Sequence, residues 1–514
     1  MPTVRGNFSY EGDITLNYNK TFAERHQLYT GLSFSAGDSQ SETYSITAVG
    51  FSAINMANLG MAGAYPPDGK PSSTEARSRR VGSILNINYT FDSRYFADLS
   101  GKMEGSSKFG ANKRTAPFWS VGLGWNLHNE SFIKNNKAID NLRLRASYGT
   151  SGSQNFSSYQ ALTTYRYFSQ GYEFWNGSYM IALGNSDLTW QTTKQVNLGL
   201  ETTLFNRRVN IKVDFYNKLT ESLLADINLP TAAGYESYKA NIGEVRNRGV
   251  EMSANFFLLR DPKGLTWSVG GNLIHNRNEI LKISNALEFL NDELMTATGS
   301  NPSFLYKEGE SMNTIYVVKS LGIDPATGNE IFLNKDGVRV DTWNAEDKVA
   351  CGVDDPNVWG NLRTMLRWKN LTLNASFSYS LGRDIYNQTL VDKVENISTT
   401  RSGVNNPWNN LDRRALYDRW QNPGDNTYFK RITDFSTTYA SSRFVMEESE
   451  LRLSSLNLAY EFSPEWLRKH LKFMEYLTVS CYADDVFHLS TIKRERGTTY
   501  PFARNFSVSI ATRF

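Results

Sequence analysis

The sequence predicts an all-β fold, a transmembrane antiparallel β-barrel, and three observations lead to that prediction. Apolar and polar side chains alternate with a period of two in segments spread over all 514 residues. No stretch has the roughly 18 consecutive apolar residues that a transmembrane helix needs. The connections between the alternating segments are either very short or very long, which is typical of outer-membrane barrels.

The alternation defines the strands one by one, and 209–215 shows the pattern clearly: Val209, Ile211 and Val213 share one face, opposite Asn210 and Lys212. The clear strands are 81–91, 142–148, 196–204, 209–215, 371–379, 456–462 and 506–514. Weaker examples are 8–18, 27–36, 94–104, 117–127, 249–259, 265–275, 361–369 and 475–483. We predict about 14 strands in total. Helical periodicity is confined to 410–421 and 464–472.

The connections sort into two lengths. Minimal turns are expected at 92–94, 206–208, 260–264 and around Lys369–Asn370. Long loops are expected near 37–75, 150–190, 218–247, 278–360 and 383–447. Short turns at one end and long loops at the other predict that the long loops are extracellular.

The polar face of the strands carries charges such as Arg143, Glu201 and Lys212, whereas the other face is aliphatic and aromatic. This division fits an aqueous lumen and a lipid-covered exterior. A soluble sandwich would have to bury the apolar face in a shared core, and a propeller or solenoid would repeat a unit at fixed spacing. No such repeat is apparent.

Several functional classes are disfavoured. The net charge is only +3 with both signs mixed, so nucleic acid is not expected as a partner. The catalytic patterns GxSxG, HExxH and GxxxxGKS do not occur, and the five histidines lack ligand spacing, so we expect no enzyme, cofactor or metal. Cys351 and Cys481 belong to no CxxC motif, and the acidic stretches 324–330 and 351–357 are interpreted as turns rather than calcium sites.

A family resemblance adds to this interpretation. The sequence resembles the SusC/RagA family of TonB-dependent outer-membrane transporters of Bacteroidetes. The resembling stretches follow in order: "GKMEGSSKFGAN" at 101–112, "VGLGWNLHNESF" at 121–132, "IDNLRLRASYGTSGSQNF" at 139–156, "LGNSDLTWQTTKQVNLGLE" at 183–201, "NIGEVRNRGVE" at 241–251, "GIDPATGNEIF" at 322–332, "RWQNPGD" at 419–425 and "ESELRLSSLNLAYEF" at 448–462. The resemblance implies a 22-stranded barrel with an N-terminal plug, a TonB-contacting segment and a SusD-like surface lipoprotein as lid.

The sequence departs from that pattern, because we find no signal peptide, plug or TonB-contacting segment and too few strands. It is interpreted as the C-terminal portion of the barrel, with contact to TonB made only by the missing N-terminal part. An open sheet edge in lipid leaves backbone groups unsatisfied at several kcal/mol each. Either 8–18 pairs with 506–514, or the remaining strands belong to a separate chain or lie outside this sequence.

Candidate contact residues for substrate or lid are aromatic side chains in two long loops. They are Tyr167, Phe168, Tyr172, Phe174 and Trp175 in one loop, and Trp408, Tyr417 and Trp420 in the other. Flat aromatic faces stack on sugar rings or dock a protein, although packing within the loop is an alternative. We hypothesise that one cluster faces cargo and the other the lid. Phe514 resembles the terminal aromatic residue that acts as a barrel-assembly signal.

The predicted function is therefore import of oligosaccharides or peptides across the outer membrane, energised by TonB in the complete protein. The predicted partners are a SusD-like lipoprotein and outer-membrane lipid. The alternative is a soluble or surface-attached β-rich glycan-binding protein.

Overall fold

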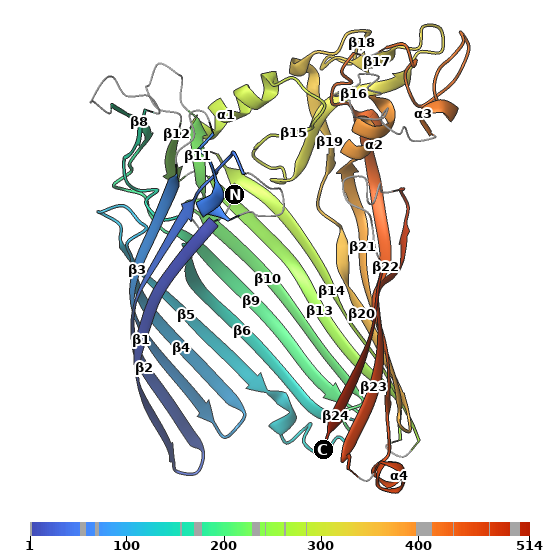
Figure 1. Ribbon diagram of the computed structural model, residues 1–514. Helices are drawn as coiled ribbons and strands as arrows, with labels where there is room; N and C mark the ends of the chain where they lie inside the picture. Colours follow the sequence, from blue (N-terminus) through green and yellow to red (C-terminus); the bar gives the residue numbers. More distant parts are fainter. Residues whose placement is uncertain are drawn as a thin grey trace. The chain divides into compact units, whose positions relative to one another are not determined.

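The computed structural model describes residues 3–51, 58–66, 71–154, 157–168, 177–228, 237–241, 243–261, 264–283, 285–396, 414–434, 436–471, 473–493 and 504–514. Fifteen long strands form one sheet in the order β1-β2-β3-β4-β5-β6-β9-β10-β13-β14-β20-β21-β22-β23-β24 (Figure 1). The predicted all-β class is confirmed, and the strand number agrees with the expected count of about 14.

The chain divides into two compact units. Unit 1 comprises Met1–Glu130, Leu144–Leu198 and Lys218–Val245, and unit 2 comprises Ser131–Arg143, Gly199–Asn217 and Arg246–Phe514.

Unit 1 begins with an antiparallel meander in which every strand pairs with the next one along the chain. Its strands are β1 (Thr3–Phe22), β2 (His26–Ser45), β3 (Ser72–Phe91), β4 (Tyr95–Ser106) and β5 (Thr115–Asn126), followed by parts of β6 (Ile139–Ser153) and β9 (Gln191–Leu204). A second, four-stranded sheet has the order β11-β12-β8-β7. Its strands are Leu224–Asn228, Ser237–Asn241, Ser178–Leu183 and Thr164–Tyr167.

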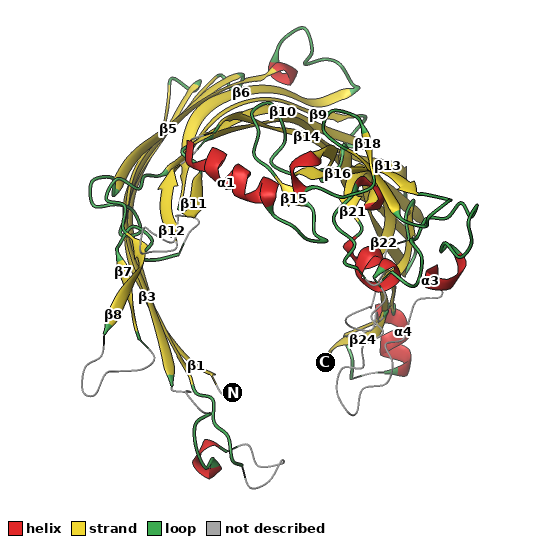
Figure 2. Ribbon diagram, turned by 90° about the horizontal axis from the view of Figure 1, so that it is seen from above, coloured by secondary structure: helices red, strands yellow, loops and turns green. Residues whose placement is uncertain are grey.

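Unit 2 continues the same antiparallel pattern. Its strands are β10 (Val209–Glu221), β13 (Glu244–Arg260), β14 (Leu265–Lys282), β20 (Val358–Trp368), β21 (Leu371–Tyr386), β22 (Val445–Glu461), β23 (Tyr476–Ser490) and β24 (Asn505–Arg513), with β10 and β13 contributing a few residues to unit 1. Helices α1 (Asn285–Thr296), α2 (Gln388–Leu390) and α3 (Arg414–Tyr417) belong to its long connections, and α4 (Pro464–His470) to a short one. Seen from above, α1 lies on the concave side of β10, β13 and β14 (Figure 2).

The apolar face of the strands is exposed rather than buried in a core. Val81 is 58% exposed, Leu123 59% and Leu16 62%. Among the residues that the structure describes, no second layer of protein covers these side chains, which speaks against a sandwich and leaves the apolar face available to lipid. None of the helices in the described segments has the length and apolar character that crossing a bilayer requires.

The turns at one end of the sheet are minimal. Ala23 and Glu24 between β1 and β2, and Asp92 and Ser93 between β3 and β4, all have positive φ, which is the backbone geometry of the tightest hairpins. In unit 2, the elements of the long connections lie at the opposite end of β20–β22 from α4 (Figure 1).

The structure differs from the sequence prediction in the length of several strands and in the expected long loops, which contain further strands and helices. Strands such as β1, β2 and β3 have 20 residues each and extend beyond the alternating segments. Outside the bilayer both faces of a strand meet water, so the alternation that marks a strand disappears there. Helix α1 was not predicted, whereas α4 and α3 fall within the two expected helical stretches.

Candidate functional site in the long connections

The long connections of unit 2 fold into a body of their own, which we call the loop body and define as the described residues of 303–353 and 387–444. It contains a five-stranded sheet, β15 (Ser303–Phe304), β16 (Thr314–Ile323), β17 (Glu330–Leu333), β18 (Arg339–Val340) and β19 (Lys348–Val353). β16 lies between β15 and β17, and it also pairs with β19.

The loop body has a buried hydrophobic core, in contrast to the exposed apolar face of the large sheet. Its main cluster consists of Leu390, Val391, Val394, Ala415, Phe429 and Phe444, all nearly or fully buried. A second cluster joins Ile315 and Val317 of β16 to Ala440. Burying these side chains stabilises a fixed arrangement of segments that are far apart in sequence.

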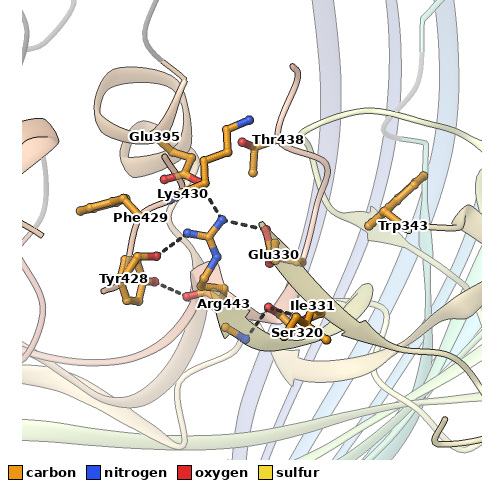
Figure 3. Close-up of polar contacts among 12 residues, drawn as sticks. Ser320, Glu330, Ile331, Trp343, Glu395, Tyr428, Phe429, Lys430, Thr438 and Arg443 are labelled. Atoms are coloured by element: carbon orange, nitrogen blue, oxygen red, sulfur yellow. Dashed lines mark hydrogen bonds and ion pairs between the residues drawn. The ribbon is translucent and has the colours of Figure 1, made fainter. Parts of the chain in front are cut away.

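A buried ion cluster joins three parts of the loop body (Figure 3). Arg443 Nη2 lies 2.7 Å from Glu330 Oε2 and 2.8 Å from Glu395 Oε1. The other terminal nitrogen of Arg443 donates to the carbonyl of Tyr428 at 2.6 Å, and the Tyr428 hydroxyl donates to the carbonyl of Arg443. The side chains of Arg443 and Glu395 are 4% and 0% exposed, so this cluster is shielded from salt and water.

The environment of the cluster favours its charged and bonded state. Burial alone lowers the pKa of Arg443, but the attraction of Glu330 and Glu395 outweighs burial and raises the pKa above its usual value. Burial raises the pKa of the Tyr428 hydroxyl to about 12, so it remains a hydrogen-bond donor at neutral pH. Arg419, 4% exposed, donates to the carbonyls of Ala415, Lys430 and Val394.

Two of the family-like stretches, 322–332 and 419–425, meet in a contact that we call the clamp. Trp420 Nε1 donates to the Pro325 carbonyl at 2.9 Å, and the Gly424 amide donates to the same carbonyl at 2.8 Å. Gly328 has a φ of +72°, and a Cβ there would lie 2.6 Å from the Trp420 ring. A residue without a side chain is therefore required at this position.

Helix α1 is tied to the loop body by Lys348. Its Nζ donates to the carbonyls of Leu294 and Ala297, at and just beyond the C-terminal end of α1, and to Ser303 Oγ. A cation at this end of a helix satisfies carbonyls that have no partner within the helix. Burial lowers the pKa of Lys348.

The predicted contact residues occupy different environments. Tyr417 is 72% exposed at the end of α3, whereas Trp420 is partly covered by the clamp. In unit 1, Tyr167 and Phe168 are exposed, and Phe168 packs against Tyr179 with ring centroids 5.1 Å apart. Tyr172, Phe174, Trp175 and Trp408 lie outside the described residues. Phe514 is exposed and stacks on Phe473.

The loop body also contains an aromatic pair that was not predicted from the sequence. Trp343 and Tyr439 stack with centroids 4.5 Å apart and an interplanar angle of 17°, and Trp343 Nε1 donates to the Ala440 carbonyl. Tyr439 is 40% exposed, so this pair presents an anchored aromatic surface. Trp343 and Tyr439 are separated by 96 positions, and no local pattern signals their contact.

The acidic turn at 324–330 is stabilised by hydrogen bonds. The Asp324 carboxylate accepts from Thr327 Oγ1 at 2.9 Å and from the Ala326 amide at 3.2 Å. Among the described residues, no three His, Cys, Asp or Glu side chains are grouped to hold a metal ion.

Comparison with known families identifies the class. A model of the family described as TonB dependent receptor-like, beta-barrel matches residues 3–301. The chain belongs to this family, whose members are outer-membrane transporters, and its relatives are SusC/RagA-like. The predicted fold, outer-membrane location and non-enzymatic class are thereby confirmed, and the soluble glycan-binding alternative is not supported.

Individual relatives agree with this assignment. The chain is 28% identical to TonB-dependent receptor P39 of Formosa agariphila, over 93% of this chain and 49% of that protein. It is 26% identical to TonB-dependent receptor SusC of Bacteroides thetaiotaomicron, over 76% of this chain and 38% of that protein. The solved structure of the RagAB peptide transporter superposes with a TM-score of 0.82 at 23% identity, over 95% of this chain and 53% of that one. The chain spans about half the length of the curated relatives it matches.

Proposed function

We propose that this chain forms the C-terminal part of the barrel of an importer that takes up oligosaccharides or short peptides, driven by TonB in the complete protein. The observation that carries this proposal is the combination of lipid-facing strands with a folded loop body at their long-loop end. The strands place the protein in the membrane, and the loop body offers a preorganised surface for cargo.

Exposed aromatic side chains support cargo contact by the loop body. Tyr417 is held at the end of α3. Trp343 is held by the hydrogen bond from its Nε1 to the Ala440 carbonyl, and Tyr439 stacks on it. Anchored rings lose little conformational entropy when they stack on a sugar ring or a peptide side chain. The exposed Tyr167 and Phe168 of unit 1 are proposed to serve as a second contact region, for cargo or for the lid.

The proposed partner is a SusD-like surface lipoprotein. Support comes from the family resemblance and from the similarity to RagAB. Co-purification of such a lipoprotein with the complete transporter from its native membrane is expected, and its repeated absence would contradict this part of the proposal.

Transport is tested in cells that express the complete protein. Uptake of a labelled cargo oligosaccharide or peptide should require both this protein and TonB. Tyr417→Ala should weaken cargo binding about three- to tenfold through loss of stacking, whereas Leu416→Ala, which changes an exposed aliphatic neighbour, should leave binding nearly unchanged. Uptake that persists without TonB would refute the proposed importer, and equal affinities of the two variants would refute the contact role of Tyr417.

A further inference from the structure

A cationic site lies on the outward face of unit 1, on the same face as the lipid-facing side chains. Val81 and Leu85 of β3 pair with Ala36 and Leu32 of β2, and directly paired residues project to the same side of a sheet. Arg79 and Arg77 share the phase of Val81, since side chains of a strand alternate with a period of two. They therefore project outward and not into the lumen.

The position along the strand corresponds to the edge of the membrane. From Phe91, beside the minimal turn, to Val81, the outward positions of β3 are apolar or aromatic with the exception of Ser83. Ten residues span roughly 33 Å along a strand, or roughly 25 Å of height at the usual tilt, which is the thickness of the apolar band of such barrels. Arg79 is the next outward residue toward the long-loop end, so it lies at the level of the outer-leaflet headgroups.

A buried carboxylate positions the two guanidinium groups. Asp38 is 8% exposed, and its Oδ2 lies 2.6 Å from Arg77 Nη2 and 3.0 Å from Arg79 Nε. The arginine side chains themselves are 42% and 62% exposed. Within the described part of the chain, Arg77 Nη1 and both terminal nitrogens of Arg79 have no hydrogen-bond partner. Glu75, two positions before Arg77 on the same face, also attracts Arg77. The positive charge therefore lies on the other side, at the adjoining cavity, whose lining includes the guanidiniums of Arg77, Arg79 and Arg114 and, among the described residues, no carboxylate.

A cavity of about 580 Å³ adjoins these groups. Its lining includes Arg77, Arg79 and Ser107 together with an exposed third cation, Arg114, and apolar side chains such as Phe109 and Leu162. The Ser107 hydroxyl accepts from the Arg79 amide at 2.9 Å, which fixes the backbone of that side of the cavity. The site combines guanidinium donors, which match a phosphate, with an apolar wall, which matches an acyl or sugar face.

We propose that this site binds the phosphorylated headgroup of the glycolipid that forms the outer leaflet of the bacterial outer membrane. The recognised chemistry is a phosphate monoester, and the outward phase and membrane-edge level favour a lipid headgroup over free phosphate. Basic pockets at a membrane surface hold lipid headgroups through these contacts. The inference goes beyond transport, since Arg77 and Arg79 have the same outward phase as the lipid-facing residues of β3.

The test uses the complete transporter, purified from its native outer membrane in mild detergent, with bound glycolipid counted by native mass spectrometry. Arg77→Gln combined with Arg79→Gln should lower the retained phosphoglycolipid about tenfold or more, through loss of charge-assisted hydrogen bonds. Arg80→Gln is the matched control. Arg80 is the next residue of the same strand on the opposite face, paired with Glu11 at 2.5 Å, so its removal should leave retention unchanged.

Removal of both arginines leaves Asp38 buried without its partners and could prevent folding. A second variant therefore adds Asp38→Asn, which removes all three charges and should show the same loss of lipid. Delipidated transporter should rebind glycolipid from vesicles, but not dephosphorylated glycolipid, and millimolar inorganic phosphate should not displace the lipid. Unchanged retention in the folded variant, equal binding of dephosphorylated glycolipid, or displacement by inorganic phosphate would each overturn the proposal.

Discussion

Removal of the Arg443 guanidinium should destabilise the loop body more than any single exposed charge can. Arg443→Met keeps the length of the side chain but removes the contacts to Glu330, Glu395 and the Tyr428 carbonyl. Glu395 and Glu330, 0% and 8% exposed, would then be left as uncompensated buried carboxylates. Breaking a buried ion pair in this way costs about 3–5 kcal/mol.

Hydrogen exchange of the complete transporter, followed by mass spectrometry, measures this cost locally. At about 1.4 kcal/mol per tenfold change, protection of the amides in β16 and in 428–444 should fall by roughly two to three and a half orders of magnitude. If the free energy of unfolding of the loop body is smaller than the cost of the substitution, the loop body should unfold completely. Protection of the strands β20–β24 should change much less, because their hydrogen bonds do not depend on the cluster.

Two further variants separate charge burial from other effects. Arg431→Met changes an exposed arginine of the same body and should alter protection by less than about threefold. Arg443→Met combined with Glu330→Gln and Glu395→Gln removes the stranded charges and should recover part of the protection. If Arg443→Met and Arg431→Met behaved alike, the buried cluster would contribute nothing measurable and the reasoning would be wrong.

Three other changes test the remaining physical claims. Gly328→Ala forces a Cβ against the Trp420 ring at φ +72° and should lower the stability of the loop body by about 2–4 kcal/mol. Gly337→Ala, at φ +78° with open space around it, should lower the stability by only about 1 kcal/mol. Faster proteolysis of the loop body in the first variant alone would verify this difference. Because burial raises the pKa of Tyr428 from its usual 10.0 to about 12, the stability it contributes is complete below pH 10 and is lost as the pH rises toward 12. Subtilisin cleavage of the loop body should increase between about pH 10 and pH 12 in the wild type, and Tyr428→Phe should lack this dependence; identical profiles would argue against the assignment. Leu85→Arg places a charge on the outward face near the middle of the bilayer, which should lower the stability of the folded protein by about 2–4 kcal/mol and weaken the heat-modifiable folded band on gels. Asn86→Arg on the other face should leave this band unchanged. An equal loss of the folded band in both variants would contradict the assigned lipid face.

The strands were predictable because their signal is local. Residues such as Val209, Ile211 and Val213 reveal a two-faced strand without any knowledge of their neighbours. The short turn at 206–208 was equally visible, since it separates two such strands directly. The extra length of β1, β2 and β3 was not, because beyond the membrane edge no difference between the faces remains.

The loop body was hidden from the sequence because its contacts are not local. Glu330 and Arg443 lie 113 residues apart, in segments without periodicity. The only signal was the resemblance of 322–332 and 419–425 to family stretches, and the structure shows that these stretches supply Gly328, Glu330, Arg419 and Trp420 to the framework. Of the eight aromatic residues predicted as contacts, Tyr417, Tyr167 and Phe168 are exposed, and their role stays a prediction.

The clamp also bears on how such a surface can diversify. Pro325 and Gly328 on one side contact Trp420 and Gly424 on the other, so two long connections on either side of β20 and β21 are fastened to each other. Once the ends are fixed, doubling the length of a flexible connection costs only about 0.6 kcal/mol. Insertions and deletions in exposed turns of the loop body, away from the clamp and the buried cluster, are therefore inexpensive, and related receptors can acquire new outer surfaces without redesigning the scaffold beneath them.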